Sequence, residues 1–175
     1  GGVGLIMCQW AKHLGATVIG TVGTDEKAEI ARAHGCDHPI VHTRENFAAR
    51  VREITGGKGV PVVYDSVGKD TFLDSLDCVQ RLGLMVSYGN ASGPVPPMDL
   101  SVLADKGSIF ITRPRLYAYI AERAELLAGA AELFDVVERG VVEIRINRRF
   151  ALADAAEAHR VLESRAVTGS MVLIP

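Results

Sequence analysis

The sequence predicts an α/β fold of the doubly wound, Rossmann type. Three observations predict it: short β-branched runs alternate with helical patterns, short loops join them, and glycines precede the first helix. Strands that alternate with helices in this way form a parallel sheet with helices on both faces. The chain has 175 residues, of which 48% are hydrophobic, and this is enough apolar material for a core.

The elements follow one another in a regular order. After Gly1–Gly4, apolar residues recur at helical spacing up to Leu14, and Gly15 then predicts the end of the first helix. The remaining patterns predict strands at 17–21, 39–41, 60–64, 82–88 and 108–112, and helices at 25–34, 46–55, 71–80 and 116–139.

The end of the chain has a different pattern. It predicts a strand at 142–146, a helix at 152–163 and a last strand at 170–174. We expect this tail to pack on something other than the main sheet. The predicted organisation is therefore a doubly wound α/β domain over residues 1–141, followed by a tail over residues 142–175.

Composition argues against several function classes. The net charge of −2 leaves no broad cationic surface for nucleic acid or for an anionic membrane, and no apolar stretch reaches the length of a membrane span. Three scattered cysteines predict free thiols in a reducing compartment, which we expect to be the cytoplasm. The five histidines form no ligand pair, so we expect no metal site.

A glycine-rich turn opens the chain. In a dinucleotide fingerprint the glycines permit a tight turn, close approach of the pyrophosphate and close packing of helix on strand. Gly1 and Gly4 fit the second and third glycines of that motif, and the first strand would then precede Gly1. A glycine-rich chain start has the same appearance, so the turn alone does not decide the matter.

The end of the second expected strand indicates which cofactor is bound. An acidic residue there holds the ribose of NAD, whereas a basic neighbourhood suits the 2′-phosphate of NADP. Gly23 stands where the acid would be, and two cations, Lys27 and Arg44, follow it. Asp25 favours NAD, although Thr24 and Asp25 also fit the start of a helix. This pattern favours NADPH, with solvated surface charge as the other reading of both cations.

Several motifs in order resemble one known group. They are Gly1-Gly2-Val3-Gly4, Ile54-Thr55-Gly56-Gly57, Val63-Tyr64-Asp65-Ser66-Val67-Gly68, Val86-Ser87-Tyr88-Gly89-Asn90, Thr112-Arg113-Pro114, Glu163-Ser164-Arg165 and Leu173-Ile174-Pro175. The sequence resembles the zinc-independent quinone oxidoreductases, the zeta-crystallin-like group of the medium-chain dehydrogenase/reductase superfamily. The resemblance covers this whole chain but only the C-terminal half of a family member.

The resemblance implies an NADPH-dependent, zinc-independent enzyme that transfers a hydride to a quinone or an activated enone. It also implies a GroES-like barrel before Gly1, with the tail returning to that barrel, and a main sheet that lacks its first strand here. No proton donor is assigned, and we expect this chain alone to be inactive. The implied cofactor-binding residues are Gly2, Val3, Gly4, Thr24, Lys27, Thr43, Arg44, Ser66, Gly89, Asn90 and Arg165.

One departure from the group concerns the adenosine phosphate. Family members often carry a tyrosine before the basic residue that follows the third strand, and this chain has Thr43 there. The adenosine contact would therefore lack a stacking ring. The resemblance also implies a homodimer through the edge strand near Ser108–Thr112, since an unblocked β-branched edge can pair with its twin.

Other functions remain open at this point. An enoyl reductase acting on acyl thioesters or enals would use the same cofactor half. A non-enzymatic nucleotide-binding module belongs to another class, although basic and aromatic residues do not alternate as RNA binding would require. A methyltransferase is disfavoured by Gly23, and a hydrolase by the lack of a nucleophile elbow around Ser66 or Ser87.

Overall fold

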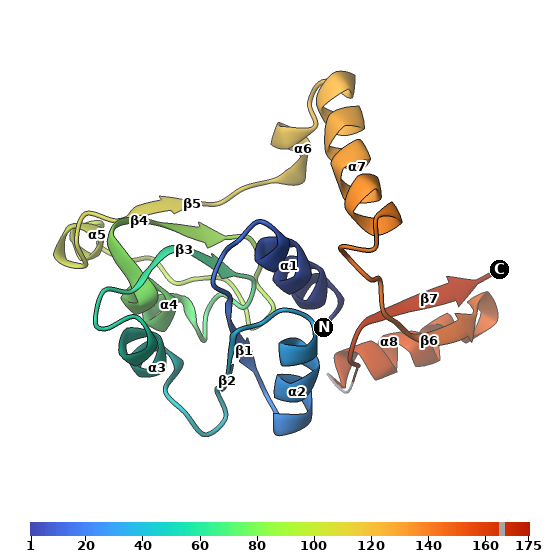
Figure 1. Cartoon of the computed structure of the whole chain (residues 1–175), viewed down its shortest axis with the longest axis horizontal. Coiled ribbons are helices and arrows are strands. Elements are labelled where there is room, and N and C mark those ends of the chain that lie inside the picture. Colours follow the sequence, from blue (N-terminus) through green and yellow to red (C-terminus); the bar gives the residue numbers. More distant parts are fainter. Residues whose placement is uncertain (165–166) are drawn as a thin grey trace. The chain divides into compact units, whose positions relative to one another are not determined.

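A computed structural model gives the fold and describes residues 1–164 and 167–175. Within these residues the strands form three separate parallel sheets (Figure 1). The chain divides into two compact units: the first unit comprises residues 1–43 and 128–175, and the second unit comprises residues 44–127. The prediction of an α/β fold with parallel sheets is confirmed.

The first unit begins with alternating helices and strands. Strand β1 pairs in parallel with β2, with Ile19 opposite His38. Thr24 caps α2, because its hydroxyl accepts a hydrogen bond from the backbone N–H of Lys27 at 3.3 Å. The elements are α1 (Gly2–His13), β1 (Ile19–Val22), α2 (Asp25–Ala33) and β2 (His38–Val41).

The first unit ends in a second parallel pair. Strands β6 and β7 pair with each other, with Ile146 opposite Ser170. The expected strand at 142–146 was wrong, because β6 begins only at Ile146, and Val142 is buried instead. These elements are α7 (Arg123–Glu138, which starts in the second unit), β6 (Ile146–Ala151), η1 (Leu152–Asp154), α8 (Ala155–Glu163) and β7 (Ser170–Ile174).

Helix α1 is tied to this last segment. The Gln9 amide donates to the backbone carbonyl of Glu143 at 3.2 Å, and the backbone N–H of Glu143 donates back to the Gln9 oxygen at 2.9 Å. A Cβ on Gly2 would lie only 2.6 Å from the Ser170 hydroxyl. A side chain at position 2 would therefore require the Ser170 hydroxyl to move away, since β7 begins beside this turn.

The second unit has one three-stranded parallel sheet in the order β3-β4-β5 (Figure 1). Its core packs Phe72, Leu76, Val79, Met85 and Ile109 against one another. The elements are α3 (Phe47–Ile54), β3 (Val60–Asp65), α4 (Phe72–Cys78), β4 (Val79–Ser87), α5 (Ser101–Asp105), β5 (Phe110–Thr112) and α6 (Leu116–Tyr119).

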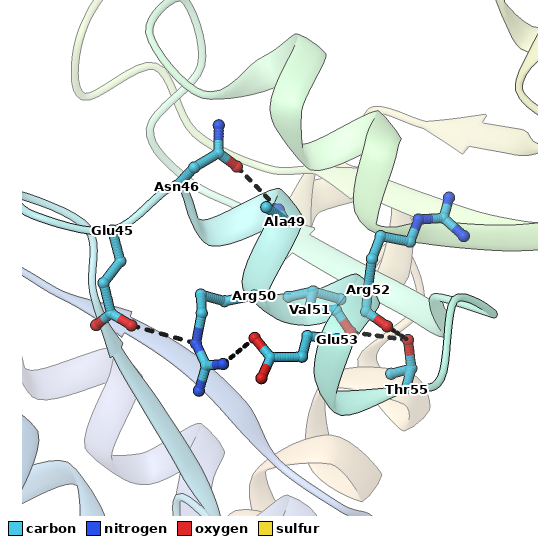
Figure 2. A network of polar contacts seen from close by, with 8 residues as sticks. All are labelled: Glu45, Asn46, Ala49, Arg50, Val51, Arg52, Glu53 and Thr55. Atoms are coloured by element: carbon cyan, nitrogen blue, oxygen red, sulfur yellow. Dashed lines mark hydrogen bonds and ion pairs between the residues drawn. The ribbon is translucent and has the colours of Figure 1, made fainter.

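Helix α3 is held by polar contacts at both ends (Figure 2). The Asn46 side chain caps its start by accepting from the backbone N–H of Ala49 at 2.8 Å. Arg50 forms ion pairs with Glu45 and Glu53 on one side of the helix. Arg52 extends the other way and donates to the backbone carbonyls of Asp77 and Val79, so α3 is tied to the junction of α4 and β4.

Two other expected boundaries were wrong for physical reasons. The helix expected at 71–80 ends at Cys78, because the fully buried Val79 pairs with Val60 as the first residue of β4. The helix expected at 116–139 is broken into α6 and α7. The break is stabilised by the Glu125 carboxylate, which accepts from the backbone N–H of Glu122 at 3.1 Å where α7 begins.

Strands β1 and β3 are edge strands of their sheets, since β1 pairs only with β2 and β3 pairs only with β4 in the part of the chain that the structure describes. The division of the chain at residue 141 is not tested by these pairings and stays a prediction. In the same described part, no helix combines the length and the apolar character that crossing a membrane requires.

Candidate cofactor site

The first turn of α1 presents backbone donors. Helix α1 has Gly1 as its N-cap residue and no side-chain cap hydrogen bond among the described residues. The N–H groups of Gly2, Val3 and Gly4 therefore have no acceptor within the helix. No acidic side chain lies in this turn, and a Cβ on Gly1 or Gly4 would have no described neighbour within 4 Å. The turn therefore has no side-chain cap and carries the positive end of the helix dipole.

Lys27 adds a full positive charge to this neighbourhood. It lies in the first turn of α2 and is half-buried. Helices α1 and α2 both begin on the side of the carboxyl ends of the parallel strands, which is where open parallel sheets bind ligands.

The carboxyl ends of β1 and β2 are joined beside Lys27. The Thr43 hydroxyl donates to the backbone carbonyl of Gly23 at 3.1 Å, and the backbone N–H of His42 donates to Val22 at 3.0 Å. Gly23, at the end of β1, brings no carboxylate there. The first unit therefore brings together Gly2, Val3, Gly4, Thr24, Lys27 and Thr43, whereas Arg44 begins the second unit.

In the second unit, the predicted cofactor-binding residues Ser66, Gly89 and Asn90 follow the carboxyl ends of β3 and β4. A Cβ on Gly89 would overlap the carbonyl oxygen of Ser66, so these two segments approach as closely as backbones can. The backbone N–H of Ala91 donates to the same Ser66 oxygen at 3.1 Å. Ser66, Gly89 and Asn90 therefore lie together, and their contact with a cofactor stays a prediction.

Asp65 organises this loop, a role that the sequence patterns did not identify. It is 4% exposed, and one carboxylate oxygen accepts from the backbone N–H groups of Val67 at 2.7 Å and Gly68 at 3.0 Å. The other oxygen accepts from the hydroxyls of Thr71 and Ser75, each at 2.7 Å. Four donors therefore satisfy this buried carboxylate. Its place at the end of a strand that precedes Ser66 is the signal that could have indicated it.

Arg113 was also missed. It follows β5, and its guanidinium donates to the backbone carbonyls of Ser87 at 2.8 Å and Gly89 at 3.0 Å. This fixes the end of β4 against the end of β5. Beside it lies a mainly apolar cavity of about 400 Å³ within the second unit, whose lining includes Phe72, Asn90, Val95, Met98, Leu103 and Arg113.

Two predictions, the role of Arg165 and the lack of a metal site, concern residues that the structure describes only in part. Arg165 lies outside the described residues, so its role stays a prediction. No group of three or more histidine, cysteine or acidic side chains that could hold a metal ion occurs within residues 1–164 and 167–175.

Comparison with known proteins gives the relatives of this chain. Residues 2–134 match the family model described as zinc-binding dehydrogenase. Quinone oxidoreductase of Pseudomonas aeruginosa is 57% identical over 175 residues, which are all of this chain and 54% of that protein. A 2-haloacrylate reductase from a Burkholderia species is 52% identical over 179 aligned residues, covering all of this chain and 53% of that protein.

A solved structure agrees with these relatives. The crystal structure of Escherichia coli quinone oxidoreductase complexed with NADPH matches with a TM-score of 0.96 at 52% identity, over all of this chain and 54% of that one. The chain spans about half the length of the curated relatives it matches. Its similarity to these proteins is to their C-terminal half. The chain belongs to the zinc-binding dehydrogenase family, and within it to the quinone oxidoreductase group of the medium-chain dehydrogenase/reductase superfamily.

Proposed function

We propose that the full-length protein that carries this chain is an NADPH-dependent reductase of quinones or activated enones, and that this chain binds the cofactor. The observation that carries the proposal is the uncapped first turn of α1, together with a β1 end that has Gly23 instead of an acid and with Lys27 in the first turn of α2. The names of the relatives support the reaction: quinone oxidoreductase and 2-haloacrylate reductase.

The phosphates of the cofactor have a matching set of donors. The N–H groups of Gly2, Val3 and Gly4 suit the pyrophosphate, because a helix N-terminus favours an anion and no described side chain caps the turn. Lys27 and Arg44 suit the 2′-phosphate that distinguishes NADPH from NADH. Thr24 and Thr43 contribute short hydroxyls, although both already bond to backbone groups.

The second unit suits the nicotinamide side of the cofactor. Ser66, Gly89 and Asn90 lie at strand ends, which is where open parallel sheets bind ligands. Asp65 and Arg113 would act as positioning residues, since they fix this loop through hydrogen bonds and face the backbone. Bound NADPH would supply the hydride, and these residues would orient it. The resemblance adds Arg165 to the cofactor contacts.

The acceptor class can be tested by steady-state kinetics of the full-length protein. NADPH oxidation would be followed with a benzoquinone, with a 2-haloacrylate and with an enoyl thioester as alternative acceptors. We expect turnover with the first two at kcat/KM values at least about tenfold above that for the thioester. Preference for the thioester would favour an enoyl reductase, and no turnover despite NADPH binding would favour a non-enzymatic module.

We also propose that the full-length protein forms a homodimer through β5. This strand pairs only with β4 within the described residues, and the side chains of Phe110 and Ile111 are 61% and 39% exposed. An exposed apolar edge of this kind is suited to pairing with its twin. Light scattering should give twice the chain mass for the wild type and the single mass for Ile111→Pro, which removes a backbone donor. A wild-type monomer at micromolar concentration would contradict the dimer.

A cytoplasmic location is part of the same proposal. The three free cysteines support it, since stable disulfides are the rule in oxidising compartments.

A further inference from the structure

Two of the three cysteines meet inside the first unit. Cys8 lies in the middle of α1, and Cys36 lies between the end of α2 and the start of β2. The Cys36 thiol donates to the backbone carbonyl of Val18 at 3.7 Å, and each cysteine shifts the pKa of the other. Neither residue belongs to the proposed cofactor contacts, so the pair has no role in the function described above.

The backbones that carry the two cysteines are held together on both sides of the pair. A Cβ on Gly35, which has φ of +91°, would lie 3.1 Å from the Cys8 carbonyl oxygen and 3.0 Å from Cβ of Lys12. On the other side of Cys36, Asp37 forms an ion pair with Lys12 and accepts from the backbone N–H of Val18 at 2.9 Å. A disulfide requires Cα atoms about 4.4–6.8 Å apart, and these contacts place the two cysteine-bearing segments side by side.

The two thiols differ in access and in acidity. Cys36 is 1% exposed, and its sulfur lies 3.0 Å from where a Cβ of Gly20 would stand, whereas Cys8 is only half-buried. The hydrogen bond with Cys36 lowers the pKa of Cys8, and the same bond together with burial raises the pKa of Cys36. Cys8 is the more accessible of the two thiols, so an oxidant in solvent would reach Cys8 before Cys36.

We propose that Cys8 and Cys36 are a peroxide-oxidisable dithiol site, in which Cys8 is oxidised first and Cys36 then closes an intrachain disulfide. In the first step the Cys8 thiolate attacks a peroxide oxygen and the O–O bond breaks, which gives a sulfenic acid and hydroxide. The hydroxide takes up the proton that the Cys8 thiol released and becomes water. In the second step the Cys36 sulfur attacks the Cys8 sulfur, the S–O bond breaks, and a second water leaves. Two thiols and one hydrogen peroxide thus give one disulfide and two waters.

The pairing would protect the chain from irreversible damage. A sulfenic acid without a partner is oxidised further to sulfinic and sulfonic acids, whereas a disulfide is restored by a thiol reductant. The buried position of Cys36 keeps it available as the resolving thiol, because solvent oxidants do not reach it before Cys8 has reacted. This inference does not depend on the proposed reductase activity.

The test is peptide mapping of the full-length protein after treatment with hydrogen peroxide, alkylation of the remaining thiols and digestion with trypsin. We expect the peptide that ends at Lys12 to be linked to peptide 33–44, with a mass two hydrogens below the sum of the two. Dithiothreitol should return both as separate alkylatable peptides. Two fully alkylatable cysteines after peroxide, or a link that joins two different chains, would overturn the proposal.

Three serine variants separate the steps. Cys78→Ser is the matched control, because Cys78 is buried in the second unit, and it should form the same link in the same yield. Cys36→Ser should accumulate a Cys8 sulfenic acid that dimedone traps, and Cys8→Ser should leave Cys36 reduced. Oxidation of Cys36 at the wild-type rate in Cys8→Ser would contradict the proposed order. If Cys36→Ser does not fold, the wild-type map and Cys8→Ser still decide the outcome.

Discussion

The loop before α4 and the first turn of α1 treat their backbone donors in opposite ways. Among the described residues, neither helix has a side-chain cap hydrogen bond. In the loop before α4, however, buried Asp65 accepts from the N–H groups of Val67 and Gly68, the carbonyl of Gly68 accepts from later N–H groups, and Gly89 closes against Ser66. At α1 no side chain caps the turn, and no described atom lies near a Cβ of Gly1 or Gly4.

The difference separates a structural loop from a binding loop. A loop whose donors are satisfied internally contributes to the stability of the fold and has none left for a ligand. A loop whose donors face open space is suited to bind an anion, and changes there should alter binding more than folding. Four substitutions test this contrast, in order of decreasing expected effect.

Asp65→Ala should have the largest effect. It leaves four donors without an acceptor, two of them backbone N–H groups, in a site that is 4% exposed. We expect the free energy of unfolding to fall by about 3 kcal/mol, measured by urea denaturation of the full-length protein. Asp70→Ala, an exposed neighbour on the same loop, is the control and should change it by less than about 0.5 kcal/mol. Equal effects of the two variants would show that Asp65 does not organise the loop.

Gly89→Ala should be next. Its methyl group would overlap the Ser66 carbonyl oxygen, which is backbone and can move only by shifting the loop. The expected loss is about 2 kcal/mol of unfolding free energy, from the same denaturation experiment. The matched control is Gly129→Ala in α7, where a Cβ meets no described atom within 4 Å and alanine should stabilise the helix slightly. An undiminished stability of Gly89→Ala would mean that the two strand ends do not meet.

Val3→Asp should weaken binding and leave folding intact. Val3 is 60% exposed in the first turn of α1. A carboxylate there is stabilised by the helix dipole but repels a pyrophosphate. We expect NADPH affinity to fall about tenfold, or about 1.4 kcal/mol, in a fluorescence titration. Val3→Asn has the same shape without the charge and should bind nearly as the wild type does. Unchanged affinity in the aspartate variant would place the phosphates elsewhere.

Thr24→Ala should have the smallest effect. It removes the hydroxyl that accepts from the backbone N–H of Lys27, at the rather long distance of 3.3 Å. Loss of such a cap costs about 1 kcal/mol of unfolding free energy, which thermal denaturation can detect. Thr17→Ala, exposed before β1, serves as the control. If both variants unfold together with the wild type, Thr24 does not function as a cap.

The sequence patterns predicted the parallel α/β fold because β-branched runs and helical spacing alternate so regularly. They failed where tertiary contacts override local preference. Val79 continues a helical pattern in the sequence, but it pairs with Val60 and is the first residue of β4. Glu125 stabilises the start of α7 within a sequence whose pattern predicts one long helix. The strand expected at 142–146 has the right apolar residues, but Val142 is buried and pairing begins later, at Ile146.

The candidate site was predictable in part for a related reason. Glycines and the cations Lys27 and Arg44 stand out in the sequence because their chemistry is visible there. Asp65 and Arg113 do not, since their importance comes from partners that are distant in the sequence, such as Ser75 and Ser87. Residues of this kind become visible only when the ends of neighbouring strands are brought together.

The central claim is that the first unit recognises NADPH through the start of α1 and Lys27. Calorimetric titration of the full-length protein with NADPH and with NADH tests it most directly, with Lys27→Ala as the variant and exposed Lys58→Ala as the control. We expect tighter binding of NADPH than of NADH in the wild type and in Lys58→Ala, and about a tenfold loss for NADPH alone in Lys27→Ala. Failure to bind either cofactor, or an equal loss for both in Lys27→Ala, would contradict the claim.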